Sequence, residues 1–466
     1  MAITNGTNAD LGVKRFDATP SNYTSLGSLI SPTKPDVRDL YIQTFGDQGI
    51  TGLLDVTGAK RSAGTADEVH WYEEGRIARR LVLDFSSGTA TLKDGHGLDV
   101  SEATAAADVV QVNDVILTST GERLIVTGSV GTGDTDTFAV KQMTDAAATD
   151  GTDIECVVIG NAYGQGTSQP SNPFEMDLKL RKNPYIITKE TFHVNGSQAT
   201  NIGWLNVNGQ YMWYLKGEMD ARRKFMNTRE AMLVFGQTKS TSGEPVAGGV
   251  TVGTSTVTGS EGYFQAVENR GIVANATTTN DSNFDNLNDL DAILLLLDKE
   301  GAPSEYAFYT DRGTSLAVDD LLAGGIATQV TAGLAGQFGA FNNDADMAIN
   351  LGFKSFTRGG YTFHKHDWKL LNSDFAGGLT DYQGAMIPLA NVVDPKSGGS
   401  NPSLEMNYKA AGNYSREMEH WVEGGGVLGY ATNGDDLAKF HYRSECNLCV
   451  RAANQHVVLR GNNFTS

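Results

Sequence analysis

Residues 204–235 predict one long amphipathic helix. Apolar side chains recur there at about the 3.6-residue period of an α-helix, which places them on one face. They are Tyr211, Leu215, Met219, Met226 and Leu233. The run ends at Gly236, a residue type that commonly follows the last helical turn. Gly217 lies in the middle, where glycine costs about 1 kcal/mol relative to alanine, so we expect a bend or a close neighbour there.

Residues 86–165 have the pattern of a separate small β domain. Short stretches of alternating apolar and polar residues are separated by turn sequences at 120–122 and 131–134. This pattern is typical of a small antiparallel barrel or sandwich. A strand at 81–85 is predicted to lead out of an extended loop, so the β domain is predicted to be an insertion in that loop.

Residues 1–45 predict an extended arm. They are polar and carry Pro20, Pro32 and Pro35 among serine, threonine and asparagine residues. Such a segment cannot bury a core of its own and must lie on another surface to become ordered.

The second half of the chain predicts a mixed lobe followed by closing strands. A helix is expected from about Asn283 to Gly301, and a short helix at 314–324 with Thr314 or Ser315 as its N-cap. The strands of the lobe are expected at 305–310, 348–356, 361–366 and 385–392. The closing strands are expected at 403–409, 437–453 and 455–460, with an interruption at 415–426.

The composition sets limits on function and compartment. The 466 residues include 36 basic and 55 acidic side chains, a net charge of −19, which disfavours a general affinity for nucleic-acid phosphates. Three cysteines cannot form a dense disulfide framework. We expect no secretory signal and no membrane segment, and therefore a protein made in a cytoplasm.

Two pairs of potential metal ligands have simpler explanations. Cys446 and Cys449 have the spacing of a redox or zinc half-site, but residues three apart on an extended segment face opposite sides. Buried structural thiols are therefore favoured. His364 and His366 share a face of a predicted strand, and Asp367 faces the other way. Because the sequence identifies no third ligand, surface or interface histidines are favoured over a metal site.

Three further patterns are weak. His420 and Trp421, with Glu419 and Glu423, suggest an acid–base pocket, but no nucleophile accompanies them and a packing turn is favoured. The GxGxxG spacing of Gly424, Gly426 and Gly429 lacks the strand and helix of a dinucleotide site, so a turn is favoured. A basic cluster on the long helix favours a solvated face or a salt bridge to a neighbouring acidic subunit. It consists of Arg222, Arg223, Lys224 and Arg229.

The chain also lacks the common catalytic motifs. No phosphate-binding loop, HExxH, GxSxG or EF-hand sequence is present. We therefore predict no catalytic, cofactor-binding or metal-binding residue, no cofactor, and a protein that is not an enzyme.

Three stretches carry a resemblance to a known family. They are ArgLysAsnProTyrIleIleThrLysGluThrPhe at 181–192, TyrLeuLysGlyGluMetAspAlaArgArgLysPhe at 214–225 and GluAlaMetLeuValPheGly at 230–236. Residues 415–424 have a similar character. With the order of the predicted parts, these stretches resemble the major capsid proteins of tailed bacteriophages, which have the Hong Kong 97-type fold.

The resemblance implies an α+β fold of five parts. These are an N-terminal arm at 1–45, an E-loop region at 46–200 holding the inserted β domain at about 86–165, a peripheral domain at 201–280 with the spine helix 204–235, an axial domain at 281–395, and returning strands at 396–466.

The resemblance also implies that the function is assembly. Copies would form hexamers and pentamers of an icosahedral head that encloses packaged double-stranded DNA without sequence-specific binding. The chain would reside in the virion after assembly in the host cytoplasm. Scaffolding, portal and head-decoration proteins are candidate further partners.

Two alternatives stay open. An encapsulin-type shell protein shares the fold, although such chains tend to be shorter and lack the inserted β domain. A phage tail or adhesin-like β protein would explain the glycine, threonine and serine content, but not the helix at 204–235.

Overall fold

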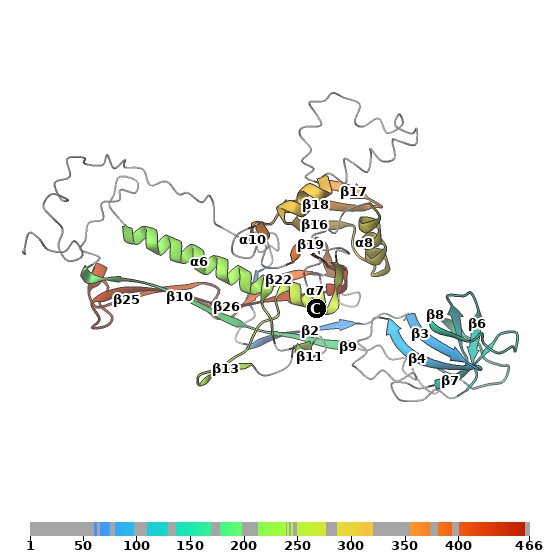
Figure 1. Cartoon of the computed structure of the whole chain (residues 1–466). Coiled ribbons are helices and arrows are strands. Elements are labelled where there is room, and N and C mark those ends of the chain that lie inside the picture. The colour runs from blue at the N-terminus through green and yellow to red at the C-terminus, as the bar shows by residue number, and fades with distance from the viewer. Residues whose placement is uncertain are drawn as a thin grey trace, which may run out of the picture.

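The chain combines a long helix on a β-sheet, a small barrel and a mixed lobe (Figure 1). The computed structural model describes residues 60–62, 66–74, 80–96, 110–128, 137–168, 178–197, 213–238, 240–241, 244–245, 249–275, 287–319, 355–372, 381–393 and 400–461. The predicted arm at 1–45 lies outside the described residues.

A closed six-stranded barrel confirms the predicted small β domain. Its strand order is β3-β4-β7-β6-β5-β8, and its core includes Leu81, Ile116 and Phe138. The strands are β3 (Arg80–Ser86), β4 (Thr89–His96), β5 (Asp114–Thr118), β6 (Arg123–Val126), β7 (Thr137–Gln142) and β8 (Gly151–Asn161). The predicted strand at 81–85 is confirmed, but the barrel begins before the predicted boundary at about 86. This strand belongs to β3, which pairs with both β4 and β8 and closes the barrel.

A two-stranded ribbon flanks the barrel in sequence. Strand β2 (Glu68–Glu74) precedes the barrel, β9 (Leu178–Pro184) follows it, and the two pair antiparallel. After Tyr185, the chain continues from β9 into β10 (Ile186–Asn195). The barrel is therefore carried on a ribbon whose return strand leads directly into the main sheet (Figure 1).

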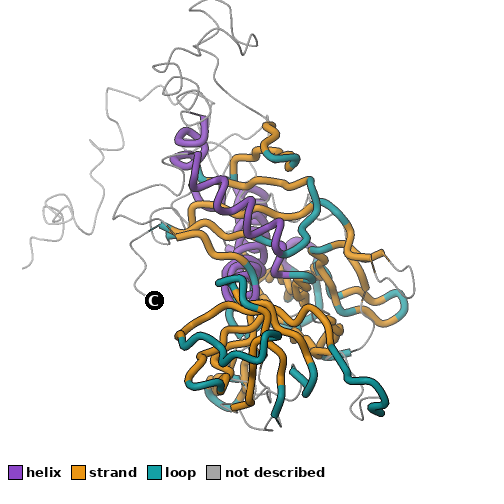
Figure 2. The backbone as a smooth tube through the Cα atoms, turned by 90° about the vertical axis from the view of Figure 1, so that its right-hand side faces the viewer, coloured by secondary structure: helices purple, strands orange, loops and turns teal. Residues whose placement is uncertain are grey.

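The long helix α6 (Trp213–Phe235) packs on the main five-stranded sheet. The other strands of the sheet are β1 (Lys60–Ser62), β22 (Leu404–Tyr408), β25 (Glu419–Gly424) and β26 (Leu437–Val450). Figures 1 and 2 show the helix running alongside the strands. The Phe225 ring lies 5.8 Å from the Tyr442 ring of β26. The predicted end of the helix before Gly236 is confirmed, and its predicted first turns at 204–212 lie outside the described residues.

The buried face of α6 differs from the predicted one. Met219 was expected on the apolar face but is exposed, whereas Phe225 and Glu230 are buried. Packing on the sheet determines which face of α6 is buried, because Gly217 lies against Phe192 of β10 and Glu218 accepts a hydrogen bond from the Tyr442 hydroxyl. At about 100° per residue, Met219 lies about 200° around the helix from Gly217 and points away.

The expected close neighbour of Gly217 is Phe192. A Cβ atom at position 217 would lie 2.6 Å from Cζ of that ring. Alanine would gain about 1 kcal/mol of helix propensity, but overpacking costs about 1–3 kcal/mol. We expect Gly217→Ala to lower the free energy of unfolding in urea titrations, with Met219→Ala on the exposed face as the neutral control. A stabilisation of about 1 kcal/mol would contradict this packing.

The mixed lobe is a six-stranded sheet with helices on both faces. The strand order is β15 (Ile272–Asn275), β27 (Val457–Arg460), β19 (Tyr382–Pro388), β16 (Glu305–Thr310), β18 (Tyr361–Asp367) and β17 (Ser355–Arg358). Helix α8 (Leu287–Lys299) covers one face, and α7 (Tyr263–Arg270) and α10 (Lys369–Asn372) belong to the core on the other. The predicted strand at 305–310 is confirmed. The turn between β17 and β18 contains Gly359 and Gly360, which both have positive φ.

The short helix after β16 begins earlier than predicted. Its described part covers 312–319, and the predicted residues 320–324 lie outside the described chain. The backbone N–H of Thr314 donates to Oδ1 of Asp311 (2.8 Å). Asp311 is therefore the N-cap, and the prediction of Thr314 or Ser315 is wrong. Aspartate is a strong capping residue, and here it directly follows the strand.

The closing strands correspond to β22, β26 and β27. The packing turn expected at His420 and Trp421, within the interruption at 415–426, is wrong, because residues 419–424 form β25 and pair with β26. Small hairpins complete the fold: β11 (Ser240–Thr241) with β12 (Glu244–Pro245), β13 (Val250–Val252) with β14 (Ser255–Val257), β20 (Asn391–Val393) with β21 (Ser400–Pro402), and β23 (Ala410–Ala411) with β24 (Tyr414–Ser415). Two short 3₁₀ helices lie at Val427–Gly429 and Ala453–Gln455.

A buried polar junction fixes the ribbon to the rest of the chain. The side chain of Asn183, at the end of β9, donates to the carbonyl oxygens of Glu261 (2.9 Å) and Leu448 (2.7 Å). Its Oδ1 accepts from the Ser260 hydroxyl (3.1 Å) and the Glu261 N–H (2.9 Å). One amide therefore joins the ribbon, the segment before α7 and strand β26.

Candidate assembly surfaces

The three cysteines are buried free thiols. Cys446 and Cys449 lie on β26, where the predicted extended conformation is confirmed. Asn407 Nδ2 donates to Cys449 Sγ (3.1 Å). Burial raises the pKa of the Cys449 and Cys156 thiols to about 12, so both are protonated at neutral pH. These groups are suited to packing rather than to redox chemistry.

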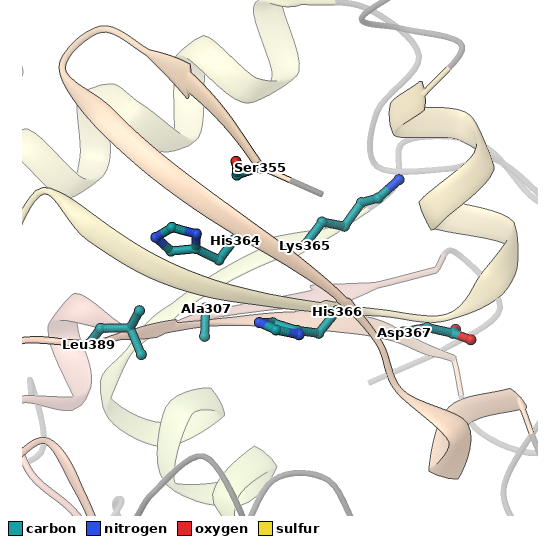
Figure 3. Close-up of a pocket in the computed structure, with 7 residues that line it drawn as sticks. All are labelled: Ala307, Ser355, His364, Lys365, His366, Asp367 and Leu389. Atoms are coloured by element: carbon teal, nitrogen blue, oxygen red, sulfur yellow. The ribbon is translucent and has the colours of Figure 1, made fainter. Parts of the chain in front are cut away.

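The two histidines of β18 line an open hollow on the lobe (Figure 3). We call it the histidine hollow; its lining is Ala307, Ser355, His364, Lys365, His366, Asp367 and Leu389. The ring of His366 stacks on Tyr309 with centroids 5.2 Å apart. Burial, and then the neighbouring His364, lowers the pKa of His366, which favours the neutral ring.

The carboxylate in this hollow is already engaged. Asp367 accepts hydrogen bonds from Arg312 and from Asn372 Nδ2. Among the described residues, no three His, Cys, Asp or Glu side chains are grouped so as to hold a metal ion.

The residues around His420 are divided between the two faces of β25. His420 stacks on Tyr442 (4.9 Å between centroids) and faces Glu218 of α6. Trp421, on the other face, stacks on His441 (5.0 Å). Strand alternation separates the imidazole of His420 from the carboxylates of Glu419 and Glu423, so these residues do not form one acid–base pocket.

The glycines after β25 form a turn, as predicted. Gly426 and Gly429 have positive φ values of 93° and 82°. The turn leads back into β26, and it is not followed by the helix that a dinucleotide site requires.

The predicted basic cluster is dispersed around α6. Lys224 forms an ion pair with Glu190 of β10 (3.1 Å). Arg229 is buried, and its Nη1 donates to the carbonyl oxygen of Glu417 (3.2 Å). Arg222 remains exposed. Lys224 and Arg229 of this cluster therefore already bind groups within the chain.

The ribbon exposes an apolar pair on one face. Tyr72 is 69% exposed, and it lies opposite Leu180 in the β2–β9 register. On the other face Trp71 is buried and donates to Oε1 of Glu73 on the same strand (3.0 Å). Within the described strands, β2 and β9 pair only with each other. A ribbon of two strands gains stability when another surface covers it.

The β13–β14 hairpin is exposed along its whole length, and we call it the valine hairpin. All six of its strand residues are exposed. In the register, Val250 lies opposite Val257 and Val252 lies opposite Ser255, which puts three valines on one face. Val250 is 72% exposed, Val252 is 63% exposed and Val257 is 50% exposed. No charged residue occurs between 245 and 260.

The base of the valine hairpin is held firmly. The N–H of Thr238 donates to Gln265 Oε1 (3.0 Å), and the Ser260 hydroxyl donates to the buried amide of Asn183. The hairpin therefore projects from a fixed base. The valine hairpin is not among the predicted features, although an uncharged, valine-rich run in a chain of net charge −19 is a usable signal of a surface.

Among the described residues, no helix is long and apolar enough to cross a membrane. No protein-family model matches the sequence, and no curated protein matches it.

Several solved structures are similar to this chain. The structure of Gordonia phage Cozz aligns over 96% of this chain and 98% of its own, with 10% identity and a TM-score of 0.41. The capsid structure of the cyanophage P-SCSP1u aligns over 95% and 100%, with 10% identity and a TM-score of 0.40. The mature capsid of bacteriophage PhiM1 aligns over 66% and 80%, with 8% identity and a TM-score of 0.33. These likenesses are loose, and the chain's own surfaces carry the argument about function.

Proposed function

We propose that the chain is a major capsid protein of a tailed bacteriophage, and that its function is self-assembly rather than catalysis. The observation that carries this proposal is the valine hairpin, a firmly based β element whose apolar face nothing in the described chain covers. Covering apolar surface gains about 25 cal/mol per Å². A neighbouring copy that covers the hairpin and the ribbon face of Tyr72 would therefore stabilise both.

The arrangement of the described elements supports this proposal. Helix α6 on its sheet would be the spine helix in the peripheral domain at 201–280, with returning strands at 396–466. The six-stranded lobe would be the axial domain, with four strands within 281–395 and two, β15 and β27, from outside that range. The barrel would be the insertion in the E-loop region at 46–200. Residues 1–45 would be the arm that overlaps a neighbouring subunit.

In the proposed assembly, hexamers and pentamers tile an icosahedral head that encloses double-stranded DNA. The net charge of −19 suits a shell that surrounds DNA without binding it tightly. Assembly would take place in the host cytoplasm, with scaffolding, portal and head-decoration proteins as further partners. The inserted barrel favours this function over an encapsulin-type shell, and α6 favours it over a tail or adhesin-like β protein.

Sedimentation velocity of the purified full-length chain tests this proposal. Rings and shells would sediment far faster than a single 49.8 kDa chain. A preparation that contains only the 49.8 kDa species at high protein concentration and over a range of salt would contradict it.

The valine hairpin should be required for assembly but not for folding. We expect Val250→Lys combined with Val252→Lys to change the free energy of unfolding by less than about 0.5 kcal/mol, because both sites are exposed. The same variant should reduce the assembled fraction at least tenfold. Thr251→Lys combined with Thr256→Lys, on the opposite face, is the matched control and should assemble more fully. Equal assembly of both variants would exclude the valine face as an interface.

A further inference from the structure

We propose that copies of this chain join head to tail through two unlike surfaces on opposite faces of the six-stranded sheet. The outer side of α8 in one copy would dock into the histidine hollow of the next. This inference rests on the proposed self-assembly and names the surfaces that would form the ring.

The first surface is an apolar patch on α8, which we call the leucine patch. It consists of Ala292, Leu295 and Leu296, which are all exposed, with Leu295 at 66%. Their i, i+3 and i+4 spacing puts them on one side of the helix. The inward side of α8 is already filled by Leu290, Leu294 and Leu297, which pack on the sheet. The leucine patch therefore plays no part in the core of its own lobe.

The second surface, the histidine hollow, lies on the other face of the same sheet. Phe308 of β16 packs in the core beneath α8, whereas Ala307 beside it lines the hollow. The β16–β18 register pairs Ala307 with His364, which puts them on one face. In Figure 3, Lys365 points away from His366 and Ala307, and its Nζ reaches Asp319 (2.5 Å). Leu389 adds an exposed apolar side chain to the hollow.

The two surfaces are complementary in shape and in hydrogen-bonding groups. An apolar patch on a convex helix matches a hollow that has an alanine and a leucine in its lining. Asp298 is exposed three residues after Leu295 on the helix, and the hollow offers the imidazoles of His364 and His366 as donors. The carboxylate of Asp367 would not repel Asp298 strongly, because Arg312 and Asn372 already hold it.

Their placement on opposite faces makes the contact heterologous. The patch and the hollow of one copy are separated by the sheet, so each must be filled by a different copy. A heterologous contact repeats from copy to copy and closes into a ring when the rotation allows it. A second copy of this chain is therefore the occupant that fits both surfaces at once.

Two charge variants test this inference. Leu295→Lys disrupts the leucine patch, and Leu389→Glu disrupts the histidine hollow. Both sites are exposed, so both variants should melt like the wild type, as should Ile159→Lys on the exposed surface of the barrel. Sedimentation velocity should show rings for the wild type and for Ile159→Lys. The ring fraction of each disruptive variant alone should be at least tenfold lower than that of the wild type.

Mixing separates head-to-tail contact from other arrangements. In an equimolar mixture, the intact patch of Leu389→Glu can enter the intact hollow of Leu295→Lys, and the lysine of Leu295→Lys can meet the glutamate of Leu389→Glu, so we expect rings that neither variant forms alone. The double variant in one chain pairs lysine with glutamate at every contact and should recover rings. Rings from either single variant at wild-type levels, or no rings from both the mixture and the double variant, would overturn the inference while leaving self-assembly intact. A wild-type chain that never assembles would instead overturn the proposed function, and the inference with it.

Discussion

Arg270→Met should lower the free energy of unfolding by about 3–5 kcal/mol. The guanidinium of Arg270, at the end of α7, donates to both carboxylate oxygens of Glu261 at 2.7 and 2.9 Å. Both side chains are buried, with 8% and 3% of their surface exposed. Methionine fills the space but leaves the Glu261 carboxylate buried without its counterion, and that desolvated charge is the source of the loss.

The urea midpoint at constant slope measures this effect. The double variant Glu261→Leu with Arg270→Met removes both charges, and it should be more stable than Arg270→Met alone. Lys224→Met provides the control, because it breaks the exposed pair with Glu190 and should cost less than about 1 kcal/mol. If Arg270→Met costs no more than Lys224→Met, the buried pair does not stabilise the core as we describe.

Asn183→Leu should release the ribbon from the body of the chain. The substitution removes all four hydrogen bonds of the buried amide and leaves the backbone groups of Glu261 and Leu448 without their partner. Each buried polar group that loses its partner costs about 1–3 kcal/mol, so we expect a total above about 3 kcal/mol. Hydrogen exchange should show a loss of protection of more than about 100-fold in β2 and β9.

The barrel provides an internal reference for that measurement. It has its own core around Leu81 and Phe138, so its exchange should change little. Leu180→Ala, on the exposed face of the ribbon, is the matched control and should leave the exchange of β2 and β9 close to that of the wild type. Unchanged protection of the ribbon in Asn183→Leu would show that other contacts hold it in place.

Much of the fold could be predicted because its signals are local. The strand at 305–310, the end of α6 before Gly236 and the barrel all follow from periodicity, glycine positions and turn residues. The buried face of α6 could not be predicted in the same way. It depends on Phe192 and Tyr442, which lie on strands far away in the sequence and select the face at Gly217 and Glu218.

The functional surfaces were harder to predict for the same reason. The amide of Asn183 meets a carbonyl 265 residues further along the chain, and no sequence pattern marks that contact. In the sequence, the leucine patch is part of one continuous apolar run at 292–297. Which of these leucines are buried depends on how α8 packs on the sheet. Only the valine hairpin had a local signal, its uncharged run at 245–260.

Negative-stain electron microscopy of the purified full-length chain tests self-assembly most directly. The surfaces described here predict capsomer rings, tubes or closed shells. Isolated 49.8 kDa monomers or trimeric fibres under all assembly conditions would contradict the account.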